Sequence, residues 1–224
     1  MIADPHAVAT DHPRAQALVE LATLVTERPW YLSRAHLTRA RAAGLSDADV
    51  LHAVALAAYF GHLNRIADAV AVPLDYTVKH EPPRADPSVA ALAPAPTGLV
   101  GRPALDLGSR APTAKALGEW KTFIFQRDAP LTRRQRTLIA RHVAGWLGDG
   151  SISPAADLTA NPLDDALRAL AQTVTLAPWQ LTDDSYTPLR RAGFDDVALF
   201  DVVATASSAG VFSRIEVALV ALGS

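Results

Sequence analysis

The residues best suited to chemistry in this chain are histidines, arginines and acidic residues, because its 224 residues include no cysteine. Without a thiol the chain has no disulfide, no thiolate metal site and no cysteine nucleophile. Histidine titrates near neutral pH and is the most frequent general acid or base. Arginine holds a carboxylate through two parallel hydrogen bonds. The composition therefore favours acid/base and electrostatic chemistry.

One predicted helix carries the first group of such residues. His52 and Tyr59 lie on nearly one face of it, and Tyr59, His62 and Arg65 follow one another at intervals of three residues. In the functional interpretation Arg65 binds a substrate carboxylate, Tyr59 contributes to the binding wall, and His52 or His62 transfers a proton. In the structural alternative the arginine pairs with an aspartate such as Asp68, and the histidines are partly exposed helix residues. Both interpretations stay open.

A second group of polar residues follows the segment LTRRQRTLIA. His142 and Trp146 are four residues apart and therefore face the same way on a helix. His142 with Asp149 forms a conceivable acid/base pair, with Trp146 in the substrate wall. Alternatively, Asp149-Gly150-Ser151 is an ordinary turn sequence that caps a following helix.

The elements that must position these residues occur in two copies. Residues 13–69 recur at residues 162–218 with a constant offset of 149, no gap, and 22 of 57 aligned positions identical. Arg65 recurs as Arg214, a second candidate for binding a substrate carboxylate, whereas the histidines and Tyr59 do not recur. The offset is too long for a solenoid unit of roughly 20 to 50 residues. The chain therefore contains a duplicated half-domain or domain.

Each copy predicts the same three helices. In the first copy they lie between Pro13 and Pro29, from Ser33 to Gly44, and from Ser46 to Pro73, at stop and capping signals typical of helix ends. The second copy repeats them after Asn161, from Thr182, and from Asp195 onward. Because alanine and leucine dominate and only 6% of residues are aromatic, closely packed helices are favoured over a sheet. The predicted fold class is all-α.

The segment between the copies divides into two parts. Residues 77–112 hold seven prolines and three glycines, which predicts a linker rather than a helix. Two further helices follow, the second capped by Thr132 and Gln135. The predicted organisation is a first repeat over residues 1–76, the linker 77–112, and a domain over residues 113–224 that comprises two added helices (113–160) and the second repeat (162–218).

Composition and motifs argue against several classes of protein. A net charge of -2 and a pI near 6.4 predict no binding of nucleic acid or of an anionic membrane surface. The N-terminal residues lack the pattern of a signal peptide, and the longest uncharged stretch, Val50–Asn64, is shorter than the roughly 20 apolar residues that span a bilayer. No metal-binding or nucleotide-binding motif occurs, so no metal and no cofactor are expected. We expect a cytoplasmic protein.

Two segments resemble a known family. The stretch AGLSDADVLHAVALAAYFGHLNRIADAVAVPLD resembles the C-terminal half of the carboxymuconolactone decarboxylase and alkylhydroperoxidase AhpD-like family, where a Gly-Leu-Ser-Asp turn precedes a helix ending in Asn-Arg-x-Ala-Asp. The stretch LTRRQRTLIARHVAGWLGDGSIS resembles its N-terminal half, in which an LS-x-R-E-R-E helix runs into Asn-Gly-Cys-x-x-Cys-x-x-x-His. The resemblance implies an AhpD-like helical bundle with an internally duplicated three-helix unit, assembled as a homo-oligomer.

The second segment departs from the family pattern where its chemistry lies. The two thiol positions fall at Asp149 and Ile152, and the histidine position falls at Ala156. AhpD-type peroxide reduction requires an attacking thiolate and a second thiol that resolves the sulfenic acid. The resemblance therefore implies family membership without the family's thiol chemistry.

We expect no cysteine-type peroxidase activity from this chain. An assay with an organic hydroperoxide and a dithiol reductant should show background turnover only. Robust turnover by metal-free protein would contradict this expectation.

The predicted function is that of a thiol-independent, carboxymuconolactone decarboxylase-like enzyme, a lyase or an isomerase. It would act by acid/base and electrostatic catalysis on a small organic acid or lactone, with a carboxylate as the expected substrate group. The alternative is a catalytically inactive AhpD-like oligomeric scaffold or small-molecule binding protein. For the enzyme we expect a cavity between the long helix of either copy and the helix that ends at Trp146, with Arg65 or Arg214 at the substrate.

Overall fold

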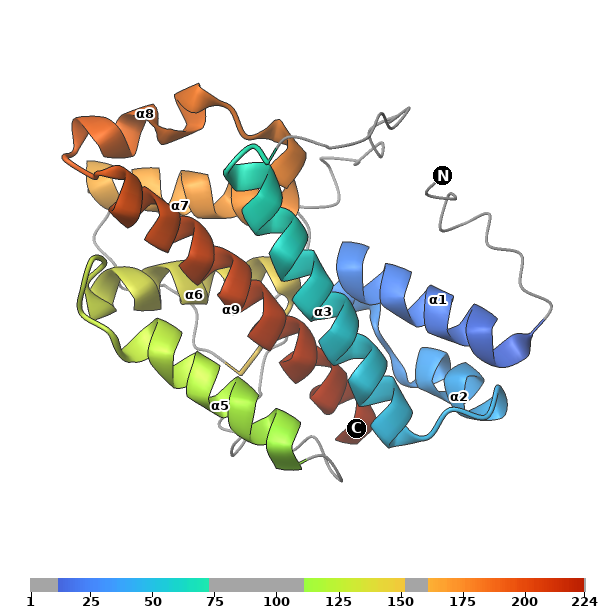
Figure 1. The fold of residues 1–224 in the computed structure, drawn as a ribbon. Coiled ribbons are helices and arrows are strands. Elements are labelled where there is room, and N and C mark those ends of the chain that lie inside the picture. Colours follow the sequence, from blue (N-terminus) through green and yellow to red (C-terminus); the bar gives the residue numbers. More distant parts are fainter. Residues whose placement is uncertain (1–11, 73–110, 152–160, 224) are drawn as a thin grey trace.

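The computed structural model describes residues 12–72, 111–151 and 161–223. Within these ranges the chain forms eight α-helices and two short 3₁₀ helices, with no strand (Figure 1). The predicted all-α class is therefore confirmed for the described residues. Most of the predicted linker 77–112, together with Ile152 and Ala156, lies outside them.

The first copy forms α1 (Pro13–Glu27), η2 (Pro29–Tyr31), α2 (Arg34–Ala42) and α3 (Asp47–Ala69). The predicted capping pair is present, because the Ser46 hydroxyl accepts the backbone N–H of Asp49 and the Asp49 carboxylate accepts that of Ser46. Two orphan N–H groups at the start of α3 are thus satisfied. Gly44 turns the chain after α2 with a φ of 85°, a conformation that favours glycine.

Between the copies lie α5 (Ala111–Gln126) and α6 (Arg133–Leu147). Helix α5 begins at Ala111, so it includes the last two residues of the predicted linker. Thr132 and Gln135 form the predicted capping box at the start of α6. Gly148 ends α6 in the left-handed region, with a φ of 72°. Its Cα lies so close to Trp30 that a Cβ there would clash.

The second copy forms α7 (Pro162–Leu176), η3 (Pro178–Gln180), α8 (Asp183–Arg191) and α9 (Asp196–Gly223). The bounds of α7, η3 and α8, and the start of α9, each fall 149 residues after those of their first-copy counterparts. The three predicted helices of each copy are therefore present. That the two backbones superpose stays a prediction.

Helix α9 joins the two halves of the core. It runs beside α3 through the centre of the bundle, with α1 and α2 to one side and α6 to α8 to the other (Figure 1). Its N-terminal half packs in the cluster formed by α6, α7 and α8, and its C-terminal half packs in the cluster formed by α1, α2 and α3. By length and composition α9 is apolar enough to cross a membrane, but 89% of its apolar window is buried inside the protein. This burial is typical of a core helix.

Candidate functional site

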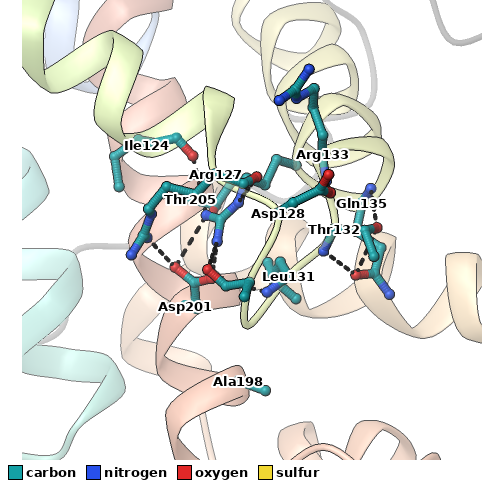
Figure 2. Close-up of polar contacts among 12 residues, drawn as sticks. Ile124, Arg127, Asp128, Leu131, Thr132, Arg133, Gln135, Ala198, Asp201 and Thr205 are labelled. Atoms are coloured by element: carbon teal, nitrogen blue, oxygen red, sulfur yellow. Dashed lines mark hydrogen bonds and ion pairs between the residues drawn. The ribbon is translucent and has the colours of Figure 1, made fainter.

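A buried group of ionic side chains links α6, and the loop between α5 and α6, to α9 (Figure 2). We call this group the ionic centre. The fully buried Arg136 of α6 pairs with Asp201 of α9 and also donates to the Thr205 hydroxyl at 3.1 Å. Arg127 donates to the same carboxylate at 2.7 Å, and so does the backbone N–H of Leu131 at 3.2 Å. The carboxylate of Asp201 thus accepts from three neighbours. We interpret this centre as structural.

A cavity of about 360 Å³ lies beside this centre, between α5, α6 and α9. Among the described residues, two carboxylate residues line it, Asp149 and Glu216, and they are only 5% and 7% exposed. The Lys121 ammonium lies 3.7 Å from the Glu216 carboxylate and 5.8 Å from the ring centroid of Phe212. Further lining residues are Thr122, Phe125, Gln126, Thr137, Ala140, Ser151, Ala209, Phe212 and Ser213. We call this space the α6–α9 cavity.

Asp149 makes the turn contact that the sequence offered as one alternative, and its acid/base role stays a prediction. Its carboxylate accepts the backbone N–H of Ser151 at 2.8 Å, which is the predicted turn interaction. The same side chain also lines the α6–α9 cavity. Helix α6 ends at Leu147, Gly148 caps it in the left-handed conformation, and Asp149 follows directly. The turn therefore places a carboxylate at the position where the family resemblance puts its first thiol.

The predicted cavity is thus present between the second long helix and α6, but its polar residues differ from most of those predicted. His142 stacks on Trp146 with ring centroids 5.6 Å apart, and neither residue lines the cavity. His52 and Tyr59 line a different cavity, between α3 and α5. His62 contacts Tyr59 and hydrogen-bonds Ser207 at 2.8 Å. Only Asp149 of the predicted catalytic residues reaches the α6–α9 cavity.

The sequence interpretation did not include Lys121 and Glu216. They lie on α5 and α9, and nothing in the local sequence of Lys121 distinguishes it from a surface charge. Glu216 gives one weak signal, because it lies in the otherwise largely apolar α9, two residues after Arg214. A glutamate in an apolar helix is seldom buried unless it has a partner.

The two equivalent arginines hold the copies together. Arg214 donates to the carbonyls of Val25 and Thr26 at 3.0 and 3.2 Å, at the end of α1. Arg65 donates reciprocally to the carbonyl of Thr175, the equivalent of Thr26, at 3.1 and 3.2 Å. Neither arginine lines the α6–α9 cavity. Burial lowers the pKa of Arg65 to about 10 and that of Arg214 well below its usual value.

Replacing Arg214 by methionine is expected to lower the free energy of unfolding by about 1–3 kcal/mol. The carbonyls of Val25 and Thr26 lose a hydrogen-bond donor, which costs stability, and the removal of a buried charge offsets part of that cost. The cost for Arg65→Met should be smaller, since Arg65 is less buried. Urea denaturation measures both. An unchanged stability of Arg214→Met would contradict the structural role of this arginine.

Burial is also the main influence on two histidines. It lowers the pKa of His62, assisted by the nearby Arg65, and it lowers the pKa of His142, assisted by Arg168 and opposed by Asp164. A lowered folded-state pKa means that the unfolded chain binds the proton more readily. Stability should therefore fall as the pH drops through the ordinary histidine value of about 6.5.

This pH dependence is expected to weaken in the variants His62→Asn and His142→Asn. Unfolding free energies measured between pH 7.5 and 5 test it. An identical slope in the wild type and both variants would contradict the assignment.

Residues 12–75 match the carboxymuconolactone decarboxylase family. The match covers less than a third of the 224 residues and corresponds to the first copy, α1 to α3. The chain therefore contains a domain of this family and carries it without any cysteine. The comparisons found no matching curated protein and no matching solved structure. In the described ranges no group of three or more histidine, aspartate or glutamate side chains is arranged to hold a metal ion.

Proposed function

We propose that the α6–α9 cavity is the active site of a thiol-independent, carboxymuconolactone decarboxylase-like enzyme. The observation that carries the proposal is the pair of buried carboxylates, Asp149 and Glu216, beside one ammonium group in a largely apolar cavity. Buried carboxylates at a cavity are characteristic of acid/base sites. The volume of about 360 Å³ lies at the lower end of the range for small-molecule sites, which indicates a compact substrate.

Each polar group then has a role. One carboxylate removes a proton from the carbon next to a carbonyl group, and the other delivers a proton at the new position, so that the net reaction is an isomerisation. Lys121 pairs with a substrate carboxylate or with the developing oxyanion. The ammonium replaces Arg65 and Arg214 in this role, since both arginines donate to backbone carbonyls. The substrate class is a small organic acid or lactone.

We also propose that residues 13–69 and 162–218 are duplicates related by an approximate twofold axis, and that the chain assembles as a homo-oligomer. The reciprocal bonds of Arg65 and Arg214 support the duplication, because each residue reaches the equivalent carbonyl in the other copy. Exposed apolar residues on α3 that do not line the cavity between α3 and α5, namely Phe60 and Leu63, support an assembly. A homo-oligomer is tested by light scattering after size exclusion.

A catalytically inactive binding protein is the second candidate. It is favoured by the mostly apolar second cavity between α3 and α5, which offers one histidine and no carboxylate. Binding there without turnover at the α6–α9 cavity would identify the chain as a binding protein.

Hydrogen exchange tests the enzyme proposal. Candidate lactones and unsaturated or oxo acids are incubated with the protein in D₂O, and loss of the proton next to the carbonyl group is followed by NMR. The matched variant is Thr137→Phe, which enlarges an exposed residue at the cavity, with Thr173→Phe on α7 as its control. Exchange by the wild type and the control, but not by Thr137→Phe, is the expected result. Equal exchange by all three proteins would mean that the reaction does not take place in the α6–α9 cavity.

A further inference from the structure

A second cavity, of about 320 Å³, lies between α3 and α5 and takes no part in the proposed reaction. Residues at one-turn and two-turn spacing on both helices line it, among them His52, Leu56 and Tyr59 of α3 and Ala116 and Trp120 of α5. Leu56 is 59% exposed and Tyr59 is 45% exposed. Large apolar side chains that border a cavity and remain exposed indicate a binding surface. We call this space the α3–α5 groove.

The second copy shows what fills the corresponding place on α9. The equivalents of His52 and Leu56, 149 residues later, are Asp201 and Thr205, both of which are buried. The fully buried guanidinium of Arg136 donates to both of them. In the first copy this face of α3 is covered only loosely by α5. On the duplication proposed above, a slot that holds an arginine side chain in one copy is an open groove in the other.

The residue types at these positions differ between the two helices. Where α9 has an aspartate and a threonine that bind a guanidinium, α3 has an imidazole and a leucine. The rings of Tyr59 and Trp120 meet edge-to-face, with centroids 6.3 Å apart and an interplanar angle of 86°. Such rings offer both faces and edges to a further aromatic ring at separations of about 4.5–7 Å. The groove is thus apolar and aromatic where its counterpart is ionic.

His52 adds one directional polar group. Its Nδ1 lies 2.9 Å from the carbonyl oxygen of Ala48, and a carbonyl only accepts, so Nδ1 carries the hydrogen. In the neutral ring Nε2 is then an acceptor. Because His52 lines the groove, a ligand in it meets an acceptor that can receive an O–H or N–H.

We propose that the α3–α5 groove binds a planar aromatic molecule that carries a hydroxyl or N–H group. Its rings pack against Tyr59, Trp120 and Leu56, and its O–H or N–H donates to Nε2 of His52. The site is separate from the α6–α9 cavity, because α5 presents Trp120 to one and Lys121 to the other.

The experiment uses 2-naphthol as the probe and the full chain as the protein. The expected result is saturable binding of one molecule per chain, measured by calorimetry. Ala116→Leu adds bulk inside the groove and is expected to weaken binding roughly ten-fold or more. The control Lys115→Leu adds the same side chain at the neighbouring exposed position, which does not line the groove, and should bind like the wild type. Thr137→Phe, at the other cavity, should also leave binding unchanged.

The hydrogen bond is tested by comparing 2-naphthol with naphthalene, which lacks the hydroxyl. His52→Phe should weaken 2-naphthol about 3- to 10-fold, as for the loss of one hydrogen bond, and should leave naphthalene almost unaffected. Thermal unfolding shows that each variant is folded. The proposal is overturned if 2-naphthol does not saturate, if Ala116→Leu binds it as well as Lys115→Leu does, or if Ala116→Leu instead dissociates an oligomer. The last result would show that a second copy of the chain covers the groove.

Discussion

Replacing Asp149 by asparagine is expected to lower turnover roughly 100- to 10,000-fold, the usual loss when a general acid or base is removed. Asparagine keeps the size of the side chain and an oxygen that can accept the backbone N–H of Ser151. The turn after α6 should therefore persist, and only the proton transfer should be lost. Turnover of the substrate found by hydrogen exchange is the measurement, normalised to folded protein.

Asp128 provides a matched control for this variant. Like Asp149 it accepts a backbone N–H near one end of α6, in this case that of Arg133 at 2.7 Å, but it does not line the cavity. Asp128→Asn should retain full turnover, whereas Glu216→Gln should lose turnover as Asp149→Asn does. Wild-type turnover in Asp149→Asn would show that this carboxylate takes no part in the reaction.

Replacing Asp201 by asparagine is expected to lower the free energy of unfolding by about 3–5 kcal/mol, the cost of breaking a buried ion pair on one side. The guanidinium of Arg136 is fully buried and would lose its counter-charge, as would Arg127. The asparagine amide would also turn N–H groups toward arginine donors. Urea denaturation followed by circular dichroism measures the loss.

Thr205→Val is the control for this second prediction. Thr205 lies one turn further along α9 and accepts a single hydrogen bond from Arg136. Its loss should cost only about 0.5–1.5 kcal/mol, since a neutral group is removed and the ion pair remains. A similar cost for the two variants would mean that the charge of Asp201 contributes little to stability.

The sequence by itself determined the helices and most of their ends, although α5 begins at Ala111, inside the predicted linker, and α3 ends at Ala69, before Pro73. Ser46 with Asp49, and Thr132 with Gln135, form capping boxes that depend on residues three apart, so their effect is readable without tertiary contacts. The offset of 149 likewise predicted that α7 and α8 would repeat α1 and α2. The absence of thiols was equally certain, because it is a matter of composition.

Only the tertiary structure decided which polar residues share a cavity. Helix α9 is apolar on nearly all sides, so its pattern does not show that Glu216 faces α5 or that Asp201 faces α6. The contacts of the arginines could not be predicted from the sequence either. Arg214 reads as a binding residue in the sequence, yet its donors reach carbonyls 188 and 189 residues away. Such contacts depend on how the two copies pack, and helix periodicity records only which residues share a face of one helix.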